Sequence, residues 1–211
     1  MLSKTDESAR KVIFFGDSIT QAGVKPGGYI ARLGDSLRKK GLKDKVELIG
    51  AGIDGNKVYD LYLRMEDDVL ANNPDVVVVY VGVNDVWHKT TRGTGTDPDK
   101  FQQFYESVLT KLKHKNIAAI ICTPAVIGEK TGLSNPQDED LNQYAQIIRT
   151  IAGKNNLPLC DLRKAFLEYN EKYNPGNQQS GILTTDRVHL NDKGNQLVAD
   201  LLLPMILQQP G

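Results

Sequence analysis

The sequence predicts a three-layer α/β/α sandwich on a five-stranded parallel sheet, with a flavodoxin-like strand order. Five short apolar runs alternate along the chain with longer segments whose apolar residues recur at helical spacing. This alternation is typical of parallel sheets with helices on both faces. The run DVVVVYV at 75–81 has no polar alternation, which indicates a central strand covered on both sides.

The individual elements follow from the same two patterns. We predict strands at 11–15, 46–49, 75–81, 117–122 and 157–162. Apolar faces predict helices over 29–37, 58–69, 101–112, 141–151 and 165–173, and a last helix around 197–202 that Pro204 bends or ends. Glycine and polar residues predict loops at 50–56, 82–85 and 88–98.

Length and charge fit one domain spanning residues 1–211. The chain has 26 basic and 26 acidic residues, so nothing in its charge favours nucleic acid or an anionic membrane as a partner. No apolar run is long enough for an integral membrane helix. Residues 1–10, MLSKTDESAR, lack the apolar core of a signal peptide. We expect them to be a disordered lead of a protein that is cytoplasmic, or secreted or periplasmic if a signal peptide has been removed. Oligomeric state is not predicted.

The two cysteines are expected to be buried free thiols. Cys122 and Cys160 each lie in an apolar, strand-like run, and this environment favours a free thiol over a disulfide. The chain has no cysteine and histidine spacing suited to zinc.

A possible nucleophile follows the first predicted strand. Gly16-Asp17-Ser18 ends an apolar run, and the carboxyl ends of strands are where ligands bind in open α/β sheets. Ser18 could instead cap the next helix, as serine often does. Acyl transfer would need a base, a group that orients the base, and donors for the oxyanion beside this hydroxyl.

His189 is the best candidate for the base. Asp186 lies three residues before it and could hold one ring nitrogen protonated, leaving the other to accept the proton of Ser18. The alternative is a surface pair at a helix start, although Asn191 or Asp192 could cap that helix instead. His114 lies among lysines and is predicted to be solvated.

Three groups could stabilise an oxyanion. The Asn84 side chain follows the strongest strand, Gly52 follows the second strand, and the Ser18 N–H begins a helix. The alternatives are an ordinary turn asparagine and an ordinary loop glycine. Asp17, Trp87 and His88 are further candidates for lining the substrate pocket. Trp87 suits the face of a sugar, with plain packing as the alternative.

With these residues in place, the chain resembles the SGNH hydrolases, also called the GDSL esterase/lipase family. The resemblance rests on four blocks in order: Gly16-Asp17-Ser18-Ile19, Gly52, Gly82-Val83-Asn84-Asp85, and Asp186-Arg187-Val188-His189. Ile19 replaces the usual leucine, and Ala51 stands where many members have asparagine.

The resemblance implies the SGNH fold and the roles given above. Ser18 would be the nucleophile, His189 the base and Asp186 its orienter. Ser18, Gly52 and Asn84 would form the oxyanion hole. The family uses no cofactor or metal.

The expected function is a serine esterase acting through an acyl-enzyme on small-molecule, short-chain esters, including O-acetyl groups on carbohydrates. A lysophospholipase or thioesterase is the next alternative. A non-catalytic binding module on the same fold is an alternative of another class. A phosphate or nucleotide binder finds little support, because the loop after the first strand lacks a GxGxxG or P-loop pattern.

Overall fold

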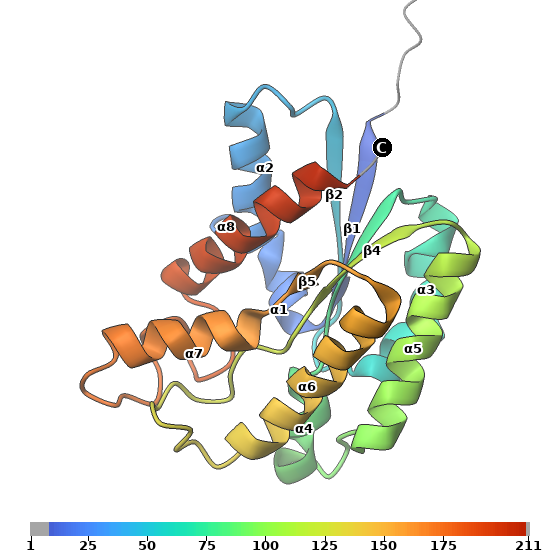
Figure 1. Cartoon of the computed structure of the whole chain (residues 1–211). Helices are drawn as coiled ribbons and strands as arrows, with labels where there is room; N and C mark the ends of the chain where they lie inside the picture. The colour runs from blue at the N-terminus through green and yellow to red at the C-terminus, as the bar shows by residue number, and fades with distance from the viewer. Residues whose placement is uncertain (1–8, 210–211) are drawn as a thin grey trace, which may run out of the picture.

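A computed structural model describes residues 9–209 and has the predicted parallel sheet. Its strand order is β2-β1-β3-β4-β5, the flavodoxin-like order, and every pairing is parallel (Figure 1). The strands are β1 (Arg10–Gly16), β2 (Val46–Gly52), β3 (Val76–Tyr80), β4 (Ala118–Cys122) and β5 (Leu159–Cys160). The switch in strand order lies between β1 and β3, where such sheets bind ligands at their carboxyl ends.

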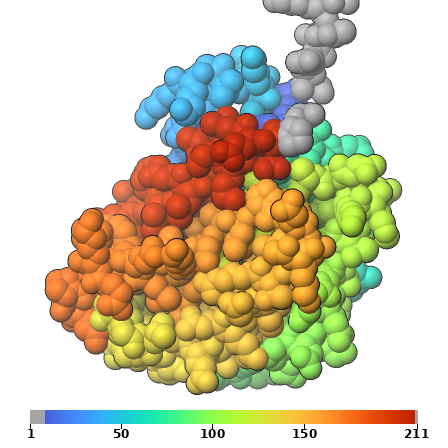
Figure 2. All heavy atoms as spheres, in the orientation of Figure 1, coloured from blue at the N-terminus to red at the C-terminus, as the bar shows by residue number. Residues whose placement is uncertain are grey.

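Helices cover both faces of this sheet. They are α1 (Ser18–Gly23), α2 (Tyr29–Lys39), α3 (Val58–Asp68), α4 (Val83–Thr91), α5 (Pro98–His114), α6 (Asp138–Asn155), α7 (Leu162–Tyr173) and α8 (Asp192–Gln208), with a 3₁₀ turn η1 (Leu70–Asn72). The packed pairs are α2 with α8 on one face, and α3 with α5 and α5 with α6 on the other. In the space-filling view, α2, α8, α7 and α6 lie side by side and cover most of the sheet (Figure 2).

The core is centred on β1 and β3. Residues 12–15 and 76–79 are almost completely buried on both sides of the sheet, which explains why these runs lack polar alternation. Burying one such side chain contributes about 1.5–3 kcal/mol. The core therefore fixes the two strands whose carboxyl ends carry Ser18 and Asn84.

Several elements differ from the sequence prediction. Residues 83–91 form α4 rather than a turn and a loop, with Gly82 before the helix at φ 131°, a conformation that favours glycine. β2 continues through Gly52 because its glycines still pair with β1. β5 is only two residues long. α8 continues through Pro204, where buried Leu202 and Ile206 anchor the helix in the core.

The chain ends and the cysteines can also be compared with the prediction. Of the lead expected at 1–10, residues 1–8 lie outside the described residues and Arg10 already belongs to β1. None of the helices within 9–209 has the length and apolarity needed to cross a bilayer. Cys122 and Cys160 are in register on adjacent strands as buried free thiols, and burial raises the pKa of the Cys122 thiol.

Candidate active site

Ser18 stands at the start of α1 with its hydroxyl free of a capping role. The preceding residue, Asp17, is the N-cap, and its carboxylate accepts the Ile19 N–H at 2.9 Å. The Ser18 Oγ instead lies 3.0 Å from Nε2 of His189. The alternative that Ser18 caps the helix is therefore not what the structure shows.

The loop before α8 fixes both partners of this hydroxyl. Asp186 Oδ2 lies 2.7 Å from Nδ1 of His189, while Oδ1 accepts the backbone N–H groups of Val188 and His189 at 3.1 and 2.8 Å. Partial burial raises the pKa of Asp186, but these hydrogen bonds and the nearby imidazole outweigh it and hold the pKa below its usual value. A carboxylate only accepts hydrogen bonds, so Nδ1 carries the proton and Nε2 can accept one from Ser18.

Gly52 lies at the end of β2, directly against the chain around Ser18. A Cβ there would meet the Gln21 backbone nitrogen at 2.2 Å and the Asp17 carbonyl oxygen at 2.6 Å. These are backbone atoms that cannot move aside easily, so only glycine allows β2 and α1 to approach this closely. The approach brings the Gly52 backbone to the segment that carries the nucleophile.

Asn84 is buried in the first turn of α4. Its Nδ2 donates one hydrogen to the Asn56 carbonyl at 3.1 Å, which leaves the second hydrogen of the amide for another acceptor. The Asn56 contact also fixes the orientation of the amide. The groups described so far can perform acyl transfer together. They are a serine hydroxyl, an imidazole, a carboxylate, a backbone N–H and a side-chain amide.

Two buried carboxyls lie beside these groups. Asp17 is 2 % exposed and Asp85, next to Asn84, is 0 % exposed. Burial raises the pKa of each to about 7. Asp85 accepts the Val58 N–H and so caps α3, whereas Asp17 caps α1. Both side chains are buried.

Trp87 and His88 follow on α4. The Trp87 ring is half-buried and meets the His189 ring edge-on, with centroids 6.3 Å apart. His88 is buried, and burial, followed by the charges of Arg92 and Lys57, lowers its pKa. Trp87 therefore borders the candidate base directly, and the His88 ring lies beside it, with centroids 6.0 Å apart. His114 is exposed, as predicted.

Sequence reasoning missed two charged residues that organise this site. Arg64, on α3, donates to the carbonyl of Gly16, which ends β1, and to that of Ala51, the last residue but one of β2. Glu129, after β4, is completely buried and accepts the backbone N–H groups of residues 182–184 at 2.9, 2.6 and 2.9 Å. In the sequence each is a single charged residue in an ordinary context, and only the fold reveals its partners.

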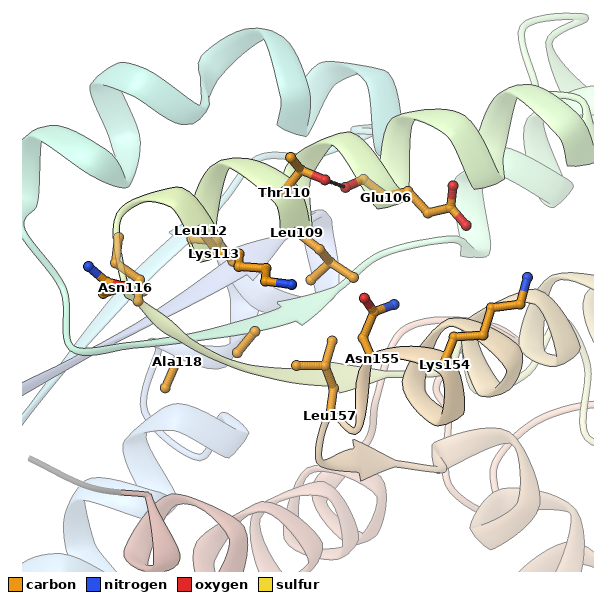
Figure 3. A pocket seen from close by; sticks show the side chains of 12 residues that line it. Glu106, Leu109, Thr110, Leu112, Lys113, Asn116, Ala118, Lys154, Asn155 and Leu157 are labelled. Carbon is orange, nitrogen blue, oxygen red and sulfur yellow. Dashed lines mark hydrogen bonds between the residues drawn. The ribbon is translucent and has the colours of Figure 1, made fainter.

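A separate hollow lies at the amino ends of the strands, at the other end of the sheet from Ser18. It has a volume of about 710 Å³ between the ends of α5 and α6 and the start of β4 (Figure 3). Leu109, Ala118 and Leu157 line it, with Lys113 and Lys154 beside them. None of the candidate catalytic residues is among its lining residues.

Residues 14–197 match the model of the GDSL-like lipase/acylhydrolase family. The chain belongs to this family. It is a carboxylic ester hydrolase with the SGNH fold.

The relatives include acetylxylan esterases. The crystal structure of an acetyl xylan esterase, AlAXEase, is 63 % identical, covers 93 % of this chain and 99 % of its own, and superposes with a TM-score of 0.92. An acetylxylan esterase of Geobacillus stearothermophilus is 29 % identical, covering 93 % of each chain. Solved catalytic mutants of that bacterium's Axe2 replace a serine, an aspartate or a histidine, with 28 % identity, 94 % coverage of each chain and TM-scores of 0.82.

Proposed function

We propose that this hydrolase removes O-acetyl groups from xylan-type carbohydrates, with Ser18 as nucleophile, His189 as base and Asp186 as orienter. The observation that carries the assignment of residues is the continuous chain of contacts from the Ser18 hydroxyl through the His189 ring to the Asp186 carboxylate, at 3.0 and 2.7 Å. The Axe2 catalytic mutants change the same three residue types, with the aspartate and histidine three positions apart as in this chain.

The reaction proceeds in two acyl transfers. Ser18 Oγ attacks the acetyl carbonyl carbon while its proton passes to Nε2 of His189. The bond to the sugar oxygen then breaks, and His189 gives its proton to that oxygen, leaving acetyl-Ser18. Water repeats the sequence: His189 takes its proton, acetate leaves, and the Ser18 hydroxyl is restored.

The negative charge of each tetrahedral intermediate falls on the former carbonyl oxygen. We assign its stabilisation to the backbone N–H groups of Ser18 and Gly52 and to the free amide hydrogen of Asn84. The hydrogen bond from Asn84 to the Asn56 carbonyl supports this role because it orients the amide before substrate arrives. Such pre-oriented donors typically lower the barrier by about 3 kcal/mol each.

Two observations favour an acetylated sugar as the substrate. The relative with 63 % identity is an acetyl xylan esterase. In this chain, the half-buried Trp87 ring borders His189, and an aromatic face beside the reacting groups suits the apolar face of a pyranose.

The test measures acetate release from acetylated xylan and hydrolysis of p-nitrophenyl esters of increasing acyl length. We expect the parent to prefer acetyl, and Ser18→Ala to lose about a thousandfold or more in kcat. A fluorophosphonate probe should label the parent and not the variant. Ser107→Ala, on the exposed side of α5, is the matched control and should behave as the parent.

Each part of the proposal can fail separately. Parental activity in Ser18→Ala would overturn the nucleophile. Preference for long acyl chains or acyl-CoA would replace the substrate class with a lysophospholipase or thioesterase. A parent that neither hydrolyses esters nor reacts with the probe would indicate a binding module.

A further inference from the structure

The Arg64 side chain joins the two strands that carry the proposed oxyanion donors. Its Nη2 donates to the Gly16 carbonyl at 2.8 Å and to the Ala51 carbonyl at 2.9 Å. Gly16 ends β1 two residues before Ser18, and Ala51 directly precedes Gly52 in β2. Arg64 Nη2 thus fixes the distance between the ends of β1 and β2. These ends lead to the Ser18 and Gly52 N–H groups, which are the two backbone donors.

The same guanidinium also reaches the third donor through one intermediate residue. Arg64 Nε donates to Asn56 Oδ1 at 2.7 Å, and the Asn56 carbonyl accepts the Asn84 amide at 3.1 Å. Arg64 is therefore connected to all three segments of the proposed oxyanion hole. The hydrogen bonds described for its guanidinium include none to Ser18, Asp186 or His189.

Arg64 is itself held rigidly. Its Nη1 lies 2.5 Å from Asp68 Oδ2, its guanidinium stacks 4.5 Å from the Phe15 ring centroid, and its side chain is only 15 % exposed. Arginine fits this position because its planar fork donates in several fixed directions at once, which a lysine ammonium on a flexible stem cannot reproduce.

We propose that Arg64 is the positioning residue of the oxyanion hole. Donors aimed at a developing charge must be held within about 0.5 Å of their productive positions, and Arg64 sets the relative places of the segments that bear them. Its removal should weaken transition-state stabilisation more than substrate binding. This inference rests on the donor assignment in the proposed function.

The first test compares Arg64→Met, which keeps the aliphatic bulk, with the parent on p-nitrophenyl acetate. We expect kcat to fall by about 30-fold with KM within about twofold, because the lost interactions act on the transition state. The affinity for a boronic acid, which forms a tetrahedral adduct with serine, should fall in parallel with kcat. Arg64→Lys should show the same pattern, since it restores the charge without the fork.

A double-mutant cycle separates positioning from general stability. If Arg64 acts partly through the Asn84 amide, Arg64→Met should cost less in an Asn84→Ala background, at most about tenfold in kcat. Arg149→Met is the matched control, because it removes another partly buried arginine, one that pairs with Asp161 away from the site. It should lower the melting temperature and leave kcat within about twofold of the parent.

The outcomes distinguish this inference from the proposed function. Parental kcat in Asn84→Ala would overturn the donor assignment itself. A normal effect of Asn84→Ala with kcat unchanged in Arg64→Met would overturn the positioning role alone. A normal effect of Asn84→Ala with strictly additive effects of Arg64→Met would overturn the part of that role that runs through Asn56 and Asn84. If Arg64→Met does not fold, Arg64→Lys and Asn56→Ala decide by the same measurements, since Asn56→Ala removes only the Nε link.

Discussion

At the scale of single residues, the site depends on which side chain supplies each structural hydrogen bond. Asp17 caps α1 and Asn191 caps α8 through the Gly194 N–H, so Ser18 and His189 are left free to meet each other. Asp85, on α4, accepts the Val58 N–H at the start of α3 from outside that helix. Two of these caps, Asp17 and Asp85, are buried carboxyls, and their burial has a consequence for stability.

The free energy of unfolding should depend on the titration of Asp85. Its folded-state pKa is raised to about 7 from 3.8, so below pH 4 both states are protonated and the carboxyl has no effect. Between pH 4 and 7 the unfolded state ionises first and stability falls; above 7 the loss is constant. Asp85→Asn should lack this loss, so the parent should lose about 2–3 kcal/mol relative to the variant between pH 5 and 8.

Urea unfolding of both proteins at several pH values measures this difference. Asp67→Asn, at an exposed position of α3, is the control and should follow the parent. Equal pH slopes for the parent and Asp85→Asn would show that Asp85 is not the group responsible. Asp17 should add a loss of the same sign, because burial raises its pKa to about 7 as well.

The sequence predicted the residues that lie in recognisable order along the chain and missed those defined only by the fold. Ser18, Asp186 and His189 could be selected because their types and spacing match a known chemistry, and the structure brings them together. The contacts by which Arg64 and Glu129 organise the site go to backbone carbonyls and N–H groups of other segments. Backbone partners leave no trace in the sequence, so neither residue could be chosen in advance.

At the scale of elements, the contact between the end of β2 and α1 requires a glycine. Gly52→Ala would place a Cβ 2.2 Å from the Gln21 nitrogen, so β2 must move away from the segment that carries Ser18. We expect a loss of about 1–3 kcal/mol in unfolding free energy. We also expect a fall of about a hundredfold in kcat, because the Gly52 N–H would be displaced.

Gly34→Ala is the control for this prediction. Gly34 lies within α2, and a Cβ there would meet nothing within 4 Å, so alanine should stabilise the helix by about 0.5–1 kcal/mol and leave kcat unchanged. Kinetics on p-nitrophenyl acetate and thermal unfolding would measure both variants. A Gly52→Ala enzyme with parental kcat would show that the close approach of the two elements is not needed for catalysis.

The elements themselves were predictable where burial imposes a pattern. As expected, the structure buries the apolar runs of three strands and the apolar faces of four helices. The strands are β1, β3 and β4, and the helices are α2, α3, α5 and α6. α4 was missed because its first turn carries Asn84 and Asp85, residues that favour turns in isolation. Their side chains are buried against the α3 start, where the Asp85 carboxylate caps α3, and this tertiary contact is invisible to local propensity.

At the scale of the whole molecule, the site joins a segment early in the sequence to one late in it. Ser18 follows the first strand, whereas Asp186 and His189 precede the last helix. The loop that carries Asp186 and His189 is closed by a bridge between Thr184 and Leu190. Glu129 holds the segment just before that loop, so the segment after β4 fixes where the C-terminal partners meet Ser18.

Glu129→Gln tests this long-range connection with almost no change in shape. In the parent, Oε1 accepts the N–H groups of Leu183 and Thr184, and Oε2 accepts that of Ile182. An amide can replace only one of the two oxygens, so at least one buried N–H would face another donor. We expect a loss of about 1–3 kcal/mol in unfolding free energy and a fall of about tenfold or more in kcat as the loop shifts.

Glu171→Gln is the control that shows whether the losses in Glu129→Gln depend on the burial of the contact. Glu171 also accepts a backbone N–H from a distant loop, that of Gly132 at 2.7 Å, but at the surface. Water can replace that hydrogen bond, so both stability and kcat should remain close to the parent. If Glu129→Gln lost stability but kept parental kcat, the Glu129 carboxylate would support the fold without setting the distance between His189 and Ser18. The loop from 184 to 190 would then have to be held by its own bridge, by α8 and by the Gly128 N–H, which donates to the Arg187 carbonyl at 2.8 Å.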